Sequence, residues 1–202
     1  MAGRQGRASS KSPGPPSDPE RDDPESVARL ICLRLLTNAP RTQAELATAL
    51  RRRGIPDDAA EAVLARFAEV KLIDDTTFAR AWVESRHHSR GLAGRALAGE
   101  LRRKGVAHDD ITAALDELAP DQELETAREL VAKRLAATRG QPGLARMRRL
   151  TGVLARKGYS PALAYRVARE ALEQEAVEAG RTAYYLADMQ EPDADDDTCE
   201  LL

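Results

Sequence analysis

The 202-residue sequence has few cysteines and few aromatic residues, and it contains no long apolar run. Its two cysteines, Cys32 and Cys199, are too few for a framework of disulfides, and Cys32 lies in an apolar helical pattern that places it in a core. Neither has a second cysteine or a histidine at the spacing of metal ligands, so we expect no metal and no cofactor. No apolar segment is long enough to cross a membrane, and the first residues lack a secretory signal. We therefore expect a cytoplasmic protein without a membrane partner.

The motifs of common enzyme sites are also missing. The sequence has no phosphate-binding loop of the Walker type and no nucleophile with a neighbouring base. His87 and His88 are adjacent, so on a helix they diverge and cannot share a metal; we predict that both lie on the surface. Asp74 and Asp75 precede a helical pattern, where acidic side chains usually cap a helix N-terminus. We predict a non-enzyme with no catalytic residues.

Charge is divided unevenly along the chain, although the formal net charge is only −2. Acidic and basic residues cancel in 1–24, whereas residues 25–175 carry a net +5 and residues 176–202 a net −7. The first segment is rich in proline and serine and too poor in apolar residues to order itself, so we predict a disordered tail. We predict that 176–202 is an acidic, partly disordered tail.

A repeat is the most informative feature between these tails. Gly54, Gly105 and Gly158 lie 51 and 53 residues apart, and each follows a basic segment. A leucine precedes each glycine by eight residues and another by four: Leu46 and Leu50, Leu97 and Leu101, Leu150 and Leu154. Repeats of this length are typical of stacked helical units, none of which buries its apolar face alone.

The apolar spacing within each repeat is helical throughout. We predict an all-α protein without a sheet, an elongated, curved solenoid of about nine helices in three three-helix modules: 25–73, 74–120 and 121–175. Thr42 with Glu45 predicts a capping box at the start of one helix, and Ser160 before Pro161 predicts the start of another. Gly94 and Gly99 predict a late start or close packing for the middle helix of the second module.

Basic side chains gather on the middle helix of each module: Arg51, Arg52 and Arg53; Arg95, Arg102, Arg103 and Lys104; Arg146, Arg148, Arg149, Arg156 and Lys157. One or two cations at a helix C-terminus complement the helix dipole and need no other explanation. Three or more in each module would form a positive stripe suited to a polyanion or an acidic protein groove. Solvated helix ends remain the alternative interpretation.

A sequence-specific DNA reader is a further alternative, because residues 42–67 have the outline of a helix-turn-helix. The second helix of such a motif would enter the major groove. Here that helix, at about residues 57–70, carries four acidic residues and only Arg66 as a base, so phosphates would repel it.

The stretch from Leu72 to Val106 resembles the central signature of the RecX family, whose members modulate the bacterial recombinase RecA. The resemblance extends more loosely over residues 25–175. It rests on an acidic pair, an aromatic-Ala step, a glycine, and a Glu-Leu step before a basic-Gly turn. The signature residues that we assign mainly to structure are Asp74, Asp75, Phe78, Ala79, Trp82, Gly91, Leu101 and Gly105.

This resemblance implies three tandem three-helix modules that lie in the groove of the RecA nucleoprotein filament. It implies a negative regulator of homologous recombination and the SOS response that inhibits strand exchange, ATP hydrolysis and co-protease activity. Arg86 and the basic residues of the middle helices are the candidate contacts to RecA or its DNA, with any direct DNA binding weak and salt-dependent. We expect a monomer. A stand-alone, helix-turn-helix-like nucleic-acid-binding protein that acts without RecA is the alternative.

Overall fold

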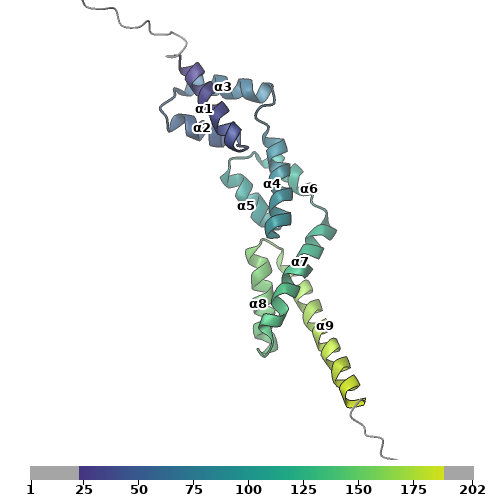
Figure 1. The fold of residues 1–202 in the computed structure, drawn as a ribbon. Coiled ribbons are helices and arrows are strands. Elements are labelled where there is room, and N and C mark those ends of the chain that lie inside the picture. The colour runs from purple at the N-terminus through teal and green to yellow at the C-terminus, as the bar shows by residue number, and fades with distance from the viewer. Residues whose placement is uncertain (1–22, 189–202) are drawn as a thin grey trace, which may run out of the picture. The chain divides into compact units, whose positions relative to one another are not determined.

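The computed structural model describes residues 23–188, which form nine α-helices and one short 3-10 helix (Figure 1). No strand occurs in this part of the chain, so the prediction of an all-α fold of three three-helix modules is confirmed. The chain divides into two compact units with the boundary between Asp74 and Asp75. The predicted disorder of 1–22 and of 189–202, and the position of Cys199, lie outside the described residues.

The first unit contains one module, built from α1 (Pro24–Asn38), α2 (Gln43–Arg51) and α3 (Asp57–Glu69). The predicted capping box is present: the Glu45 amide donates to the Thr42 hydroxyl, and the Thr42 amide donates to the Glu45 carboxylate. Cys32, Leu46 and Leu50 are fully buried in the core between the three helices, which confirms the core position predicted for Cys32. Burial raises the pKa of its thiol.

The second module contains α4 (Asp75–Arg90), α5 (Gly94–Arg103) and α6 (His108–Asp116). Gly94 is the first residue of α5 and precedes Gly105 by as many residues as Gln43, the first residue of α2, precedes Gly54, so the expected late start is not found. A Cβ at Gly94 or Gly99 would meet no atom closer than 3.5 Å, so unusually close packing is not found either. Leu97 and Leu101 face inward with no exposed surface, against Ala79 and Val83 of α4. The core of this module is therefore assembled from the positions that the repeat predicts.

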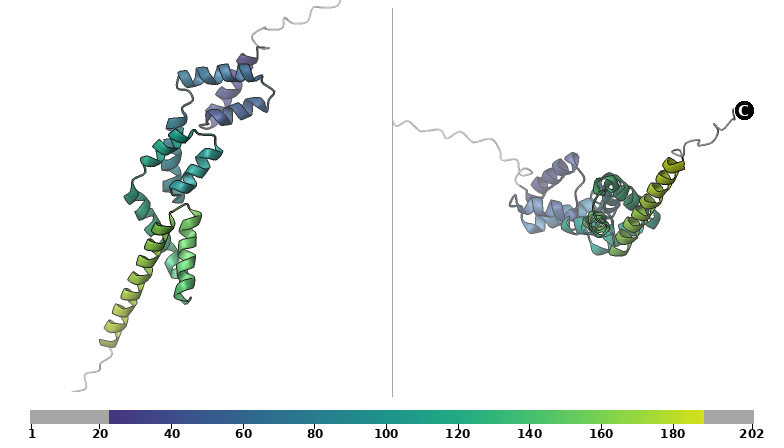
Figure 2. Two further views of the ribbon diagram at one scale, coloured as in Figure 1. Left: turned by 180° about the vertical axis from the view of Figure 1, so that it is seen from behind. Right: turned by 90° about the horizontal axis from the view of Figure 1, so that it is seen from below.

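The third module contains α7 (Pro120–Leu135), the 3-10 helix η1 (Ala136–Thr138), α8 (Gly143–Arg156) and α9 (Pro161–Asp188). As predicted, α9 begins at Pro161, and the Ser160 hydroxyl accepts from the Leu163 amide at 3.3 Å. The helix continues past residue 176, where the sequence suggests an acidic tail, and it projects beyond α7 and α8 (Figure 2). Ala93 of the second module is buried in the core of the third.

No helix among residues 23–188 combines the length and the apolar character needed to cross a lipid bilayer.

Candidate functional site

The basic residues of the first unit are exposed at the end of α2 and in the turn that follows. Arg51 lies 3.9 Å from the Asp57 carboxylate, and Arg53 donates to the Ala49 carbonyl at 3.1 Å. All three arginines of this segment, Arg51, Arg52 and Arg53, are exposed to solvent. Gly54 follows with φ 73°, and a Cβ there would meet no atom within 4 Å, so the turn is open on its outer side.

The end of α5 also presents exposed arginines. Arg102 and Arg103 are exposed in its last turn, and Arg95 is exposed near its start. Lys104 follows directly and differs from them, because it is half-buried against aromatic rings of α4.

These rings belong to a group that we name the Trp82 cluster: Phe78, Trp82, Arg86, Glu100 and Lys104. Phe78 and Trp82 are stacked with ring centroids 5.6 Å apart, one helical turn from each other on α4. The Arg86 guanidinium lies 4.2 Å from the centroid of the Trp82 ring, and the Lys104 ammonium lies 4.3 Å from it. The indole N–H donates to the Glu100 carboxylate at 2.9 Å, and Glu100 also lies 3.8 Å from Arg86. We assigned Trp82 to structure, but it contacts two of the basic residues that the sequence singled out.

In the third module, Arg148, Arg149 and Arg156 are exposed on α8. Arg149 and Arg156 line a shallow cavity of about 250 Å³ together with Arg134 of α7. The sequence analysis missed Arg134, because it lies on the first helix of its module and outside the basic segment. Residues three positions apart lie near the same face of a helix, so Arg134 borders the face of α7 that buries Val131, and this spacing was the available signal.

Lys157 is engaged within the protein. Its ammonium donates to the Arg90 carbonyl, and its own carbonyl accepts from the Ala93 amide at 2.8 Å. The turn at Lys157 and Gly158 therefore docks onto the α4–α5 connection of the second module. The third basic-Gly turn is thus not equivalent to the first, although their sequences look alike.

Tyr159 extends the same contact. Its side chain is buried, and its hydroxyl donates to the Gly91 carbonyl at 3.2 Å. Burial raises the pKa of this phenol far above its ordinary value, with a smaller contribution from the negative charge of Glu123. Glu123 itself accepts from the Gly94 amide at 2.9 Å. The α4–α5 connection is thus held by the third module at several backbone groups.

The prediction that His87 lies on the surface is wrong. It is buried, not a surface residue, and its Nδ1 lies 2.9 Å from the Leu92 carbonyl, so Nδ1 carries the proton that is donated. Its Nε2 lies 2.9 Å from the Thr126 hydroxyl of α7. The equivalent position in the first module is Leu36, which packs on its core. Aligning His87 with Leu36 of the first module would have predicted that His87 is buried. His88 is exposed, as predicted.

The remaining signature residues lie in and around the second module. Ala79 and Leu101 have no exposed surface, and Gly91 and Gly105 have φ 60° and 78°, values that favour glycine. Thr76, next to the Asp74–Asp75 pair, donates to Asp110 of α6 at 2.6 Å. Asp75 is the first residue of α4, and Asp74 lies 3.8 Å from the Lys71 ammonium.

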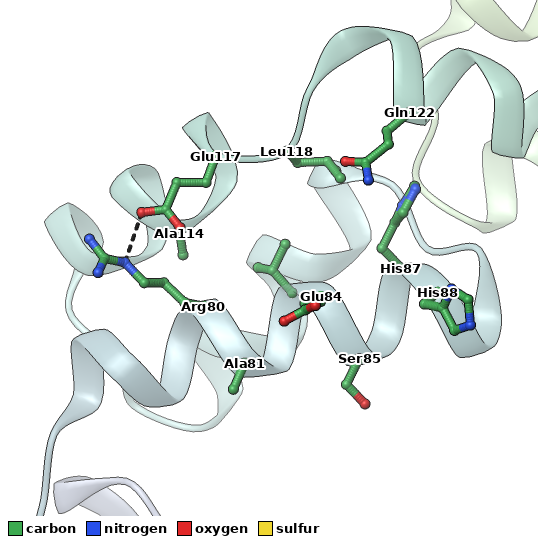
Figure 3. A pocket seen from close by; sticks show the side chains of 11 residues that line it. Arg80, Ala81, Glu84, Ser85, His87, His88, Ala114, Glu117, Leu118 and Gln122 are labelled. Carbon is green, nitrogen blue, oxygen red and sulfur yellow. Dashed lines mark ion pairs between the residues drawn. The ribbon is translucent and has the colours of Figure 1, made fainter.

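An open groove of about 690 Å³ is lined by residues of α4, α6 and the start of α7 (Figure 3). Arg80 and Glu117 form an ion pair at 2.8 Å at one end, and His87 and His88 lie at the other (Figure 3). Within the described part of the chain, no group of three or more histidine, cysteine, aspartate or glutamate side chains could hold a metal ion.

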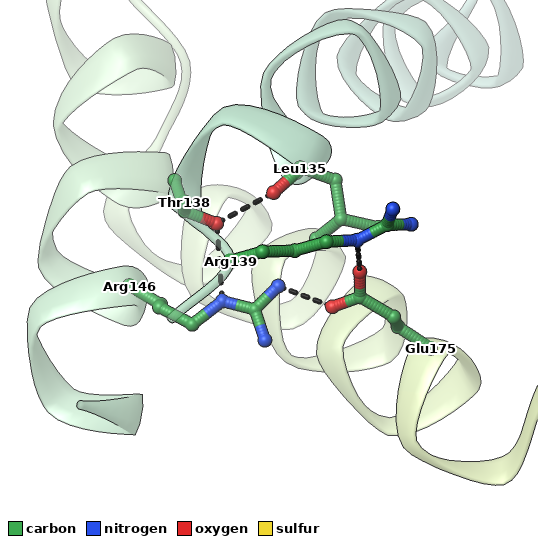
Figure 4. Close-up of polar contacts among 5 residues, drawn as sticks. All are labelled: Leu135, Thr138, Arg139, Arg146 and Glu175. Atoms are coloured by element: carbon green, nitrogen blue, oxygen red, sulfur yellow. Dashed lines mark hydrogen bonds and ion pairs between the residues drawn. The ribbon is translucent and has the colours of Figure 1, made fainter. Parts of the chain in front are cut away.

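Two arginines near the start of α8 are paired with Glu175 of α9 (Figure 4). Arg139 donates to one carboxylate oxygen at 2.7 Å, and Arg146 donates to the other. Arg146 also donates to the Thr138 hydroxyl at 3.0 Å, and that hydroxyl donates to the Leu135 carbonyl (Figure 4). The hydrogen bonds from Arg139 and Arg146 hold the pKa of Glu175 below its ordinary value. These two charges therefore join η1, α8 and α9.

Each of the three modules matches a model of one RecX domain, and the three domains follow the same order along the chain. Residues 28–67 match a model described as the first three-helix domain of RecX, residues 74–115 match the second, and residues 121–168 match the third.

Relatives named regulatory protein RecX are similar over most of their length. The protein from Thermobifida fusca is 60% identical over 173 residues, which is 85% of this chain and 94% of the relative. The protein from Streptomyces coelicolor is 59% identical over 170 residues, or 84% of this chain and 90% of the relative. The protein from Mycolicibacterium smegmatis is 44% identical over 182 residues, which is 87% of this chain and 97% of the relative.

Two crystal structures have a similar fold. One is of a regulatory protein RecX, with a TM-score of 0.67 and 26% identity, covering 73% of this chain and 72% of the other. The second is RecX from Lactobacillus salivarius, with a TM-score of 0.69 and 20% identity, covering 73% of this chain and 96% of the other.

Proposed function

This chain belongs to the RecX family of regulatory proteins, and we propose that it is a cytoplasmic, non-catalytic regulator that binds the RecA nucleoprotein filament. The proposed effect is inhibition of strand exchange, ATP hydrolysis and co-protease activity, and thereby of homologous recombination and the SOS response. The proposal takes its partner from the family resemblance.

The observation that carries the proposal is the recurrence of exposed arginines at the end of the middle helix in each module. Arg52 follows α2, Arg102 and Arg103 end α5, and Arg156 ends α8. A filament repeats its surface along its axis, so a protein with a repeated basic surface can contact successive positions on it. Lys157 is removed from the candidate contacts, because it binds the Arg90 carbonyl.

The direct test follows RecA-dependent ATP hydrolysis on single-stranded DNA while this protein is added in substoichiometric amounts. We expect the rate of hydrolysis to fall, because one bound regulator would affect many RecA subunits of a filament. An unchanged rate together with tight binding to naked DNA would instead favour the stand-alone nucleic-acid-binding protein.

A second test reverses the charge at the end of α5. The double variant Arg102→Glu, Arg103→Glu should weaken filament binding at least about tenfold and flatten its dependence on salt, because two cations that release counterions are lost. Binding is measured by fluorescence anisotropy at several salt concentrations. Lys133→Glu with Arg166→Glu changes the net charge equally at two exposed residues of α7 and α9 and should bind like the wild type. Equal weakening by both double variants would show that only net charge matters.

A further inference from the structure

The Trp82 cluster has an aromatic residue at a position where the other two modules have an aliphatic one. In each module the first helix buries an alanine and, four residues later, a second residue: Ala28 and Cys32, Ala79 and Val83, Ala127 and Val131. The residue just before the second buried position is Ile31 in the first module, Trp82 in the second and Leu130 in the third. Ile31 and Leu130 are partly buried and pack on their cores. An aliphatic side chain is therefore enough to pack on the core at this position. The indole of Trp82 also packs on its core, and it adds an N–H donor and a wide aromatic face.

The aromatic pair is also specific to the second module. Phe78 corresponds to Val27 of the first module and Thr126 of the third, so only here do two rings stack along the first helix. Both rings are partly exposed. The indole is fixed in orientation, because its N–H donates to Glu100 while the ring lies against Phe78.

Charges around the rings favour an anion. Arg86 and Lys104 lie over the Trp82 ring, and the adjoining Arg102 and Arg103 are exposed. Glu100 is the acidic group of the cluster, and its charge is offset by Arg86 at 3.8 Å. A fixed aromatic surface next to several cations is the combination with which proteins bind single-stranded nucleic acid, since bases stack on rings and phosphates pair with cations.

We propose that the Trp82 cluster is a binding site for single-stranded nucleic acid, in which a base stacks on the Phe78 and Trp82 rings. The base takes the position that the Lys104 ammonium occupies, 4.3 Å from the Trp82 centroid. Lys104 has a long, flexible side chain and turns toward the flanking phosphate, beside Arg102 and Arg103. Paired bases in a duplex have no free face to stack, and an acidic peptide would use the cations but not the rings.

This inference deepens the proposed function, since it assigns the strand within a nucleoprotein filament as a ligand of the second module. Its test uses the full chain without RecA. Trp82 is the single tryptophan of the sequence, so its intrinsic fluorescence reports on this site alone. We expect a short oligothymidylate to quench the emission of Trp82, and inorganic polyphosphate or polyglutamate of similar charge to leave it largely unchanged.

Variants separate stacking from charge. Trp82→Leu, which copies the aliphatic residue of the other modules, should weaken binding of a labelled oligothymidylate about tenfold, and Trp82→Phe should retain most of the affinity. Lys104→Gln should weaken binding and lower its salt dependence, whereas Lys133→Gln, which removes an equal charge on α7, should not. Circular dichroism checks that Trp82→Leu is folded; if it is not, the quenching experiment and Trp82→Phe decide.

Four results would overturn the inference. Polyphosphate that quenches as strongly as oligothymidylate would show a phosphate site without stacking. Polyglutamate that quenches while oligothymidylate does not would show a surface for an acidic protein. A folded Trp82→Leu variant that binds like the wild type would remove the ring from the site. If the wild type inhibits RecA-dependent ATP hydrolysis but shows no quenching by oligothymidylate, this inference fails and the proposed function stands.

Discussion

Gly158 is closely surrounded by neighbouring atoms, unlike Gly54 in the first module. It has φ 90°, and a Cβ at this position would lie 2.4 Å from the Ala96 amide nitrogen and 2.7 Å from the Ala96 Cβ. Gly140 has a similar φ of 77° in the same unit, but a Cβ there would meet nothing within 4 Å. Both positions favour glycine for its backbone freedom, and only Gly158 also requires glycine for space.

The variant Gly158→Ala should therefore lower the free energy of unfolding by about 3 kcal/mol or more, since it combines left-handed strain with a backbone clash. Gly140→Ala, which suffers the strain alone, should cost about 1 kcal/mol. Urea unfolding followed by Trp82 fluorescence measures both. Equal losses for the two variants would mean that the contact between the third basic-Gly turn and α5 contributes nothing to stability.

At the scale of elements, the two halves of the second unit are held by polar contacts as well as by a shared core. The α4–α5 connection receives Tyr159 and Lys157 from the third module, and His87 reaches Thr126 of α7. Within the third module, Glu175 joins α9 to the start of α8 and to η1 (Figure 4). Helices far apart in sequence are thereby fixed by a few side chains at their ends.

The Glu175 contact predicts a pH dependence. Its pKa is lowered in the folded state by hydrogen bonds from Arg139 and Arg146, so its stabilisation is present above the pKa of an unfolded glutamate, about 4.3, and is lost as the pH falls through the folded value. Glu175→Gln should cost about 1 kcal/mol at neutral pH and nothing in strong acid. Urea midpoints at the two pH values test this. Glu173→Gln, which removes only an exposed ion pair with Arg169, should change stability little at either pH.

At the scale of the molecule, the chain is two compact units rather than three independent modules. The first unit has a core made only of its own residues, whereas the core of the third module includes Ala93 of the second. The second and third modules therefore share buried surface as well as the contacts of Lys157 and Tyr159. We expect these two modules to fold and unfold together.

This division predicts that a variant in one unit leaves the other unaffected. Thr42→Ala removes the cap of α2 and should destabilise the first unit by about 1 kcal/mol. The midpoint of urea unfolding followed by Trp82 fluorescence, which reports on the second unit, should stay constant, while the transition followed by circular dichroism broadens. A parallel shift of the fluorescence midpoint would mean that the two units unfold as one.

Much of the fold was predictable because its signals are local. Leu46, Leu97 and Leu150 and their partners one turn later are fully buried, as the repeat predicts, since helical spacing alone decides which side chains share a face. Thr42 and Ser160 cap the helices that they were predicted to start, because a cap involves only the next few residues. The family resemblance carried by the second module is confirmed by matches over all three modules.

The candidate site depended more on the tertiary structure. From sequence, Lys104 and Lys157 are equivalent cations before a glycine, and His87 resembles its exposed neighbour His88. In the structure Lys104 lies over Trp82, Lys157 binds the Arg90 carbonyl, and His87 is buried between two modules. The sequence by itself determined the helices, their buried faces and the family, because these follow from spacing along one chain segment. Only the tertiary structure decided which basic side chains are exposed to solvent and which are engaged within the protein, because that depends on contacts between residues far apart in sequence.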